Sequence, residues 1–372
     1  MTFSFAQITK PTLLLNEPIA RANMARIAEK AAAAGVRFRP HFKTHQSAEI
    51  GEWFRPLGVS AITTSSLDMA LYFAGHGWQD ITIAFPANLR QAAELSALAA
   101  RVKLGLLVES VETAERLAAA LQAPAEAWIK IDVGGRRTGL AWDRPQEVLP
   151  VARAIHNGGK LRLRGLLTHA SQTYGARGAD EACRRYRESV ARITGLREQL
   201  AALGLGGLEI SVGDTPGSSL CELGPVDEIR PGNFVFYDAQ QVQIGSCRPE
   251  DVAVALACPV VARHPERGEV IVYGGAVHLS KDFLVEGETR MYGKVALPLE
   301  DSQGARWSAP LDGAFVAGLS QEHGIVRLPP EVLGQVQLGD LLCILPAHSC
   351  LSVTLMKEYV TLEGRVIATF NK

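Results

Sequence analysis

The sequence predicts a (β/α)₈ barrel of the TIM type followed by an all-β domain. Eight short β-rich runs alternate with segments of helical spacing before about residue 240, which matches the size of such a barrel. After about residue 245 the chain changes to β-runs that are broken by Gly and Pro, with little helix. We therefore expect a barrel domain over residues 1–245, whose N-terminal strand could join the other domain, and a β domain over residues 246–372.

The expected barrel strands are short runs of apolar and β-branched residues. They lie at 36–42, 61–65, 80–85, 103–109, 127–133, 161–169, 208–213 and 228–238. Segments between them are rich in Ala, Leu, Glu and Arg with apolar spacing of three and four, which is typical of crossover helices. Examples are 87–100, 111–122 and 179–204. A doubly wound open sheet is the alternative, but eight units without a G-x-G-x-x-G after the first strand favour the closed barrel.

Composition and charge narrow the class of protein. Apolar residues make up 47% and charged residues 21%, as in globular proteins. The formal net charge is −1 and no Lys/Arg run is concentrated, which argues against a nucleic-acid partner. No stretch reaches the apolar length of a membrane span, and the N-terminus lacks the pattern of a cleaved leader. We expect a cytoplasmic protein with a small-molecule substrate, and reduced thiols at all six cysteines.

Lys43 stands out because it directly follows the first expected strand, in RPHFKTHQ. A barrel places its reactive groups at the C-terminal ends of its strands. Positive charge from Arg39, His41 and His45 would lower the pKa of the Lys43 amine and favour Schiff-base chemistry. A lysine taken alone is usually a surface charge, so its position and neighbours carry the argument.

Small and hydroxyl-bearing residues follow the seventh expected strand, in SVGDTPGSS. Backbone N–H groups in such a segment can approach an anion, which indicates a phosphate-binding loop at Gly213 and Thr215. A turn without a ligand is an equally good interpretation of these residues alone. Because a carboxylate would repel a phosphate, Asp214 must point away or be paired.

Taken in order, several segments resemble the fold-type III pyridoxal 5′-phosphate (PLP) enzymes, and within them the D-serine dehydratase and D-threonine aldolase family. The resemblance covers nearly the whole chain, and the order and spacing of its fragments make it specific. The fragments are PTLLLN, RPHFKTH, IKIDVGGRRTGL, LLTHASQTY, SVGDTPGSS, EIRPGNFVFYD and PAHSC. The resemblance implies an alanine racemase-like N-terminal barrel, a D-serine dehydratase-like β domain, and PLP bound to Lys43 as an internal aldimine.

The same resemblance implies further cofactor-binding residues. Arg137 matches the position at which related racemases place an arginine near the phenolic oxygen of the cofactor, and Arg136 is its rival. His169 and Tyr174 fall where the family has groups that face the substrate and the cofactor ring. A second part of the phosphate-binding loop is expected at Gly232 and Asn233, in RPGNF.

His348 and Cys350, in PAHSC, are an imidazole and a thiol two residues apart. On an extended chain they would point to one side and could bind a borderline-soft ion such as Zn²⁺. H-x-C alone is weak evidence, since a buried cysteine beside a surface histidine is common. The resemblance strengthens it, because dehydratase-like members carry His-x-Cys here, whereas aldolases carry His-x-Asp.

The leading hypothesis is a metal-assisted dehydratase that converts a D-3-hydroxy amino acid, such as D-serine, to a 2-oxo acid and ammonia. Lys43 would remove the Cα proton, and the metal would polarise the β-hydroxyl group. The alternative is a retro-aldol lyase of the D-threonine aldolase kind, with His169 as the base. A racemase fits less well because it needs a second base on the opposite face and no metal. A non-catalytic PLP carrier would be a barrel without a second domain, and the expected β domain with its PAHSC motif argues against it. We expect a homodimer with no membrane partner.

Overall fold

The computed structural model describes residues 3–302 and 304–371, and the chain forms two compact units. The barrel unit comprises Arg26–Lys43 and Gly51–Gly232, and the β unit comprises Met1–Ala25, Thr44–Ile50 and Asn233–Lys372. The domains expected from the sequence are continuous segments, whereas each of these units collects separate segments of the chain.

The barrel unit is built on a parallel sheet in which eight strands pair in sequence around a ring. Their order is β2 (Arg37–Phe38), β10 (Glu228–Ile229), β9 (Glu209–Gly213), β8 (Leu161–His169), β6 (Ala125–Asp132), β5 (Lys103–Val108), β4 (Asp80–Pro86) and β3 (Ala61–Thr64), and the short β7 (Leu140–Ala141) pairs with β6. A parallel bridge between His41 and Thr63 connects the two ends of this order. The ring is thus nearly closed, and the predicted (β/α)₈ barrel is confirmed.

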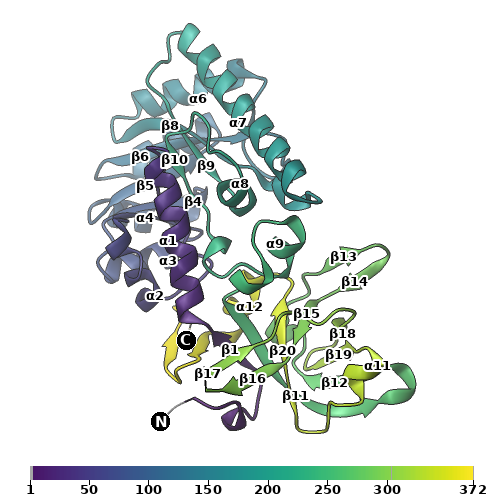
Figure 1. The fold of residues 1–372 in the computed structure, drawn as a ribbon. Coiled ribbons are helices and arrows are strands. Elements are labelled where there is room, and N and C mark those ends of the chain that lie inside the picture. Colours follow the sequence, from purple (N-terminus) through teal and green to yellow (C-terminus); the bar gives the residue numbers. More distant parts are fainter. Residues whose placement is uncertain (1–2, 303, 372) are drawn as a thin grey trace. The chain divides into compact units, whose positions relative to one another are not determined.

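Helices alternate with these strands and cover the outside of the sheet (Figure 1). Their bounds are α1 Glu17–Ala33, α2 Ala48–Glu52, α3 Leu67–Gly75, α4 Ala92–Ala99, α5 Val111–Ala120, α6 Pro145–Asn157, α7 Ala179–Ala202 and α8 Thr215–Leu220. Serine residues start two of them directly after a strand: the hydroxyl of Ser66 accepts from the amide of Met69, and that of Ser110 from the amide of Thr113. These N-caps satisfy amides that the first turn leaves unpaired, and so fix where the chain reverses.

The first and last barrel strands are shorter than the sequence predicts. The runs at 36–42 and 228–238 contain only the two-residue strands β2 and β10. Pro231 has no N–H to continue the ladder, and the next residues form a 3₁₀ turn, η5 (Asn233–Val235). Periodicity alone could not separate these β-rich runs into a short strand and a folded loop.

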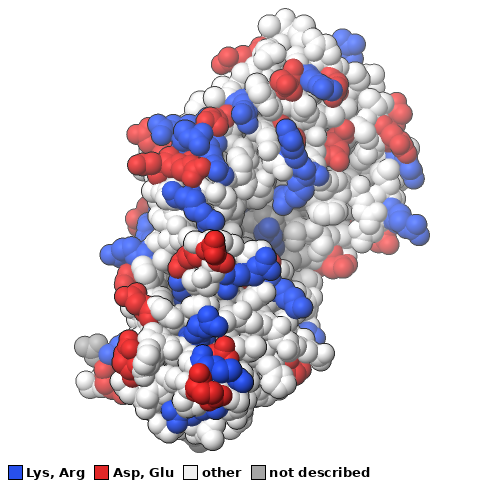
Figure 2. Space-filling model, turned by 90° about the vertical axis from the view of Figure 1, so that its right-hand side faces the viewer, with Lys and Arg blue, Asp and Glu red and all other residues white. Residues whose placement is uncertain are grey.

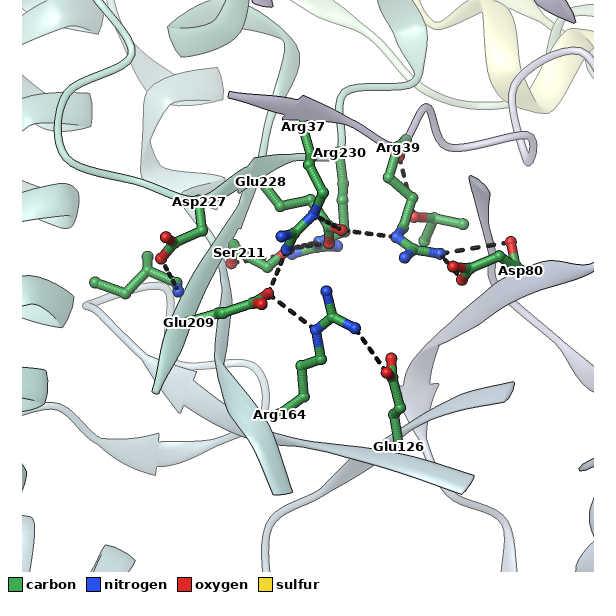
Figure 3. Close-up of polar contacts among 12 residues, drawn as sticks. Arg37, Arg39, Asp80, Glu126, Arg164, Glu209, Ser211, Asp227, Glu228 and Arg230 are labelled. Atoms are coloured by element: carbon green, nitrogen blue, oxygen red, sulfur yellow. Dashed lines mark hydrogen bonds and ion pairs between the residues drawn. The ribbon is translucent and has the colours of Figure 1, made fainter. Parts of the chain in front are cut away.

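Charged side chains pair across the N-terminal ends of the barrel strands (Figure 3). The guanidinium of Arg39 donates to Glu228 (2.8 Å) and Asp80 (2.6 Å), and that of Arg164 donates to Glu126 (2.6 Å). Burial would raise the pKa of Glu228, but the charge of Arg39 and the hydrogen bond from it lower the pKa of this carboxyl. Paired buried charges therefore occupy this end of the barrel, and residues that could carry chemistry lie at the other end.

The β unit contains a nine-stranded sheet. The strand order is β12 (Glu269–Tyr273), β19 (His323–Arg327), β18 (Phe315–Leu319), β15 (Gly293–Ala296), β20 (Leu341–Pro346), β11 (Val254–His264), β1 (Thr12–Leu15), β21 (Glu358–Thr361) and β22 (Val366–Ala368). Strand β1 pairs antiparallel with β11 and parallel with β21, so the N-terminal strand belongs to this sheet. The predicted C-terminal β domain is confirmed.

Smaller elements of the β unit lie outside this sheet. Two hairpins are formed by β13 (Leu284–Glu286) with β14 (Thr289–Met291), and by β16 (Pro298–Asp301) with β17 (Gly304–Trp307). The short helices are α9 Ala239–Ile244, α10 Ala276–Leu279, α11 Pro330–Leu333 and α12 Ser349–Met356. Helices α9 and α12 matter for the site described below, because they border the PAHSC segment.

One expectation about the cysteines is wrong. Cys183, on α7, and Cys221, which ends α8, form a disulfide, whereas Cys258 and Cys343 remain buried thiols. The pairing joins positions 38 residues apart through the packing of α7 against α8, which cysteine spacing does not reveal.

The surface is mixed in charge. Over the face shown in Figure 2, Lys and Arg side chains are intermixed with Asp and Glu. Among the described residues, none of the helices has the length and apolar character needed to cross a membrane.

Candidate active site

Lys43 lies in a turn over residues 42–45, a few residues after β2, and buried neighbours fix its backbone. The amide of His41 donates to the carbonyl of Pro231 (2.8 Å), and the amide of Phe42 donates to that of Thr63 (2.9 Å). The Phe42 ring is fully buried, with its centroid 5.0 Å from that of Trp78. The Lys43 side chain itself is only partly buried, so the turn is held firmly while its amine stays accessible.

His169, the last residue of β8, belongs to the same end of the barrel. Its Nδ1 hydrogen-bonds the carbonyl oxygen of Gly213, and because a carbonyl only accepts, Nδ1 carries the proton and Nε2 keeps its lone pair. Burial, followed by the charges of Lys43 and Arg137, holds the pKa of His169 well below its usual value. The imidazole is therefore neutral.

The structure also distinguishes the two candidate arginines. The charge of Arg137 acts on both His169 and Lys130, although Arg137 itself is exposed. The backbone amide of Arg136 instead donates to the carboxylate of Asp132, in a turn where Arg136 has φ +50°. Of the two arginines, Arg137 is the one whose charge acts on His169 at this end of the barrel.

Two buried cations were not among the site residues expected from the sequence. Lys130, on β6, donates from Nζ to the carbonyl of Ile131 (3.0 Å), and burial, then the charges of Arg230 and Arg137, lower its pKa to about 8. Arg230 donates to the Ser211 hydroxyl (2.7 Å) and, through Nη2, to a backbone carbonyl of β8 (2.6 Å). The signal of Lys130 in the sequence is a cation inside an otherwise apolar strand, AWIKIDV.

The SVGDTPGSS segment forms the end of β9 and the start of α8. Asp214 caps this helix: its Oδ2 accepts from the amide of Gly217 (2.6 Å) and the hydroxyl of Thr173 (2.9 Å), so the carboxylate is paired. The amide of Thr215 donates to the hydroxyl of Tyr174 (3.1 Å). Tyr174 is therefore brought to the same loop as Thr215.

This loop has the properties of an anion-binding site. The hydroxyl oxygens Thr215 Oγ1 and Ser218 Oγ are buried and have no hydrogen-bond partner among the described residues. Buried hydroxyls without partners are costly unless a ligand or water satisfies them. Gly217 packs so closely on Tyr186 that an added Cβ would lie 2.0 Å from its ring. The loop thus fits a phosphate group, which Thr215 and Ser218 would bind.

Gly232 and Asn233 lie at the point where the chain passes from the barrel unit to the β unit. Gly232 is buried. The side-chain amide of Asn233 donates to the carboxylate of Asp238 (2.7 Å) and the hydroxyl of Ser349 (2.9 Å), and it lies 3.6 Å from the Cys350 sulfur. The Asn233 side chain therefore contacts the PAHSC segment. Only the backbone of Asn233 would then be available to bind a phosphate.

His348 and Cys350 do not lie on an extended strand as the sequence suggested. Strand β20 ends at Pro346, His348 is the N-cap of α12, and Cys350 is in its first turn. Their side chains nevertheless meet, since the imidazole and the thiol are hydrogen-bonded. Burial would lower the pKa of His348, but Cys350 and the nearby carboxylates outweigh it and raise this pKa to about 9.

The side chains of His348 and Cys350 fit a zinc ion as ligands. An imidazole nitrogen and a thiolate sulfur are both ligands that Zn²⁺ prefers. His348 Nδ1 lies 3.5 Å from Asp238 Oδ2, and Cys350 Sγ lies 3.3 Å from Thr44 Oγ1. Within the described residues no cluster of three or more His, Cys, Asp or Glu side chains is arranged around a common point. His348 and Cys350 are the two donors that the PAHSC segment would offer the ion.

Comparisons with known proteins agree with this architecture. The family model of the alanine racemase N-terminal domain matches residues 19–240, and that of the serine dehydratase domain matches residues 253–362. D-threo-3-hydroxyaspartate dehydratase of Delftia sp. (strain HT23) is 33% identical over 92% of this chain and 91% of its own length. D-serine dehydratase of Dictyostelium discoideum is 27% identical over 98% and 96%, respectively. A solved structure of a D-threo-3-hydroxyaspartate dehydratase mutant in the metal-free form has a TM-score of 0.88 and 29% identity, covering 98% of each chain.

The fold and these matches define a fold-type III PLP-dependent enzyme. Within this class, the chain belongs to the family that contains D-serine dehydratase, D-threo-3-hydroxyaspartate dehydratase and D-threonine aldolase. The resemblance noted in the sequence is confirmed, as is the expected activity class, a PLP-dependent lyase for D-3-hydroxy amino acids. The non-catalytic alternative is not favoured.

Proposed function

We propose that this chain is a zinc-assisted dehydratase that converts a D-3-hydroxy amino acid, such as D-serine or D-threo-3-hydroxyaspartate, to a 2-oxo acid and ammonia. The observation that carries this proposal is the meeting of His348 and Cys350 at the start of α12, a nitrogen and sulfur donor pair. The similarity to two dehydratases supports it.

The barrel unit supplies the groups that would hold the cofactor and move the proton. PLP, when bound, supplies an electron sink for the charge that develops at Cα. Lys43 would anchor it, and Thr215 and Ser218 would bind its phosphate. The amine of Lys43 would be the base that takes the Cα proton. Arg137 lies near enough to influence His169 electrostatically, and its fixed positive charge favours negative charge developing beside it.

The β unit supplies the groups for the leaving hydroxide. A zinc ion bound by His348 and Cys350 would act as a Lewis acid that makes the β-hydroxyl a better leaving group. Thr44 follows Lys43 in the chain and contacts the Cys350 sulfur at 3.3 Å. One peptide bond therefore connects the lysine to a residue that contacts a metal ligand.

The state of His169 favours dehydration over retro-aldol cleavage. Aldol cleavage needs a base for the β-hydroxyl proton, and the sequence-based alternative gave this role to His169. Its pKa is held well below the usual value, which makes the neutral ring a weak proton acceptor near pH 7. Product analysis tests this: 2-oxo acid and ammonia are expected, whereas glycine and an aldehyde from D-threonine would favour the aldolase.

The metal requirement is tested by chelation. A strong chelator should abolish dehydration and leave the visible absorbance of the bound cofactor, because anchoring at Lys43 does not need the ion. Cys350→Ser should behave like the chelated protein, since a hydroxyl is a poor zinc ligand at neutral pH. Cys343→Ser, a matched change at a buried thiol of β20, should keep the metal. Full activity after chelation, with no zinc by elemental analysis, would refute the proposal.

The proposal also includes a homodimer in the cytoplasm that binds no nucleic acid or membrane. Size-exclusion chromatography with light scattering tests the oligomeric state, and fractionation of the source cells tests the location.

A further inference from the structure

We infer that Asp238 is the positioning residue of the metal site, through which both His348 and Cys350 are held in place. This inference rests on the proposed function, because it concerns the site of the proposed zinc ion. Asp238 is fully buried and precedes α9, at the end of the EIRPGNFVFYD segment. It was not among the candidates that the sequence suggested.

The two carboxylate oxygens of Asp238 have different partners. Oδ1 accepts from the amide of Gln241 (3.0 Å) and thereby caps α9. Oδ2 accepts from the backbone amide of Ser349 (3.0 Å) and the side-chain amide of Asn233 (2.7 Å), and it lies 3.5 Å from His348 Nδ1. A helix cap needs only one oxygen, so capping does not account for Oδ2, which faces the PAHSC segment.

The contact with His348 determines which ring nitrogen a metal can use. Nδ1 faces the carboxylate and would carry the proton, which leaves Nε2 with a lone pair for the ion. A carboxylate behind a metal-binding histidine fixes the ring orientation and raises its basicity. Asp238 is thus placed to keep the proton on Nδ1 when the Nε2 proton leaves on metal binding.

The other contacts extend this control to Cys350. The amide of Ser349 is fixed by Asp238, and Ser349 is the residue between the two proposed ligands. Asn233 donates to Asp238 and also lies 3.6 Å from the Cys350 sulfur. A single carboxylate therefore ties together the histidine, the intervening backbone and a neighbour of the cysteine.

The test is the metal affinity of Asp238→Asn in the full-length, PLP-loaded protein. Asparagine keeps the size of the side chain and caps helices as well as aspartate does. The substitution removes the negative charge and replaces the acceptor Oδ2 by an N–H donor. Asp251→Asn is the matched control: it is also a buried aspartate of the β unit that caps a short helix, accepting from the amide of Arg248 (2.9 Å). Asp238→Ser, a second change to a good cap, serves if the first variant does not fold.

Each protein is stripped of metal and titrated with Zn²⁺ against a chromophoric chelator. We expect Asp238→Asn to lose about 10–100-fold in Zn²⁺ affinity, as other partners of metal-bound histidines do, while Asp251→Asn stays within about twofold of the unmodified protein. With Co²⁺ in place of zinc, the ligand-field absorption should shift in Asp238→Asn alone, which a general loss of stability would not produce.

The outcomes separate this inference from the proposed function. If the unmodified protein binds no Zn²⁺, both are refuted. If it binds Zn²⁺ and Asp238→Asn binds equally well with the same Co²⁺ spectrum, only the role of Asp238 is refuted. An equal loss in Asp251→Asn would likewise refute it, because the effect would then belong to any buried cap.

Discussion

Asp214 provides a sharp test of the electrostatics of the SVGDTPGSS loop, because its carboxyl is buried at the N-cap of α8. Burial is the main cause that raises its pKa from 3.8 to about 6, although the amide of Gly217 and the hydroxyl of Thr173 oppose the shift. The folded protein therefore binds this proton more tightly than the unfolded chain does. The stability that the protonated group provides is complete below about pH 4 and is lost as the pH rises through 6.

The size of the effect follows from the shift. About two pKa units, at about 1.4 kcal/mol each, make ionisation of folded Asp214 cost about 3 kcal/mol. Asp214→Asn cannot ionise and still caps the helix. At pH 7 the variant should be more stable by up to about 3 kcal/mol, or about 4 °C in Tm for a chain of 372 residues. At pH 4 the difference should fall below about 1 kcal/mol.

The assay is thermal unfolding of the cofactor-free protein, followed by circular dichroism between pH 4 and 8. Asp68→Asn, a change of an exposed aspartate in the first turn of α3, is the control and should follow the unmodified protein at every pH. A difference for Asp214→Asn that stays constant over this range would contradict the reasoning, since only an ionising group gives the expected slope.

Three further outcomes follow from the structure. Borohydride trapping and peptide mapping should find the cofactor on Lys43, and modification at Lys130 alone would remove the basis of the site. Thr215→Val should weaken cofactor affinity about tenfold or more with little change in kcat at saturating cofactor, because a hydrogen bond to a charged group is worth about 1.5–3 kcal/mol; unchanged affinity would mean that the loop is only a turn. Cys183→Ser opens a crosslink to Cys221 across 38 residues and should lower the free energy of unfolding by about 3–4 kcal/mol. Reduction of the unmodified protein should match this variant in denaturant titrations, and no loss in either would contradict it.

Alternation of β-rich and helical segments was enough to predict the barrel, because each βα unit repeats the same pattern and the strands are nearly continuous apolar runs. The same pattern overestimated the length of the first and last strands. Pro40 and Pro231 interrupt these β-rich runs, and the residues that follow form loops. Lys43, His169 and Thr215 could be singled out because barrels place chemistry at strand ends.

What the sequence could not show depends on contacts between distant segments. The Cys183–Cys221 disulfide requires the packing of α7 on α8. The roles of Asp238 and Asn233 arise from contacts with residues more than 100 positions away. The structure brings His348 and Cys350 together at the start of a helix. An H-x-C spacing suits both a strand and a helix start, and periodicity does not distinguish them.

The discontinuous units have a consequence for recombining this enzyme with its relatives. The chain passes between the units at four points, which are Ala25–Arg26, Lys43–Thr44, Ile50–Gly51 and Gly232–Asn233. The sequence pattern changes from alternating strands and helices to β-runs at about residue 245. A chimera joined at 245/246 would take His348 and Cys350 from one parent and Asp238 from the other. A junction at Gly232–Asn233 would instead transfer His348 and Cys350 together with Asp238. The exchangeable module that carries this site therefore begins at Asn233, because Asp238 must come from the same parent as His348 and Cys350.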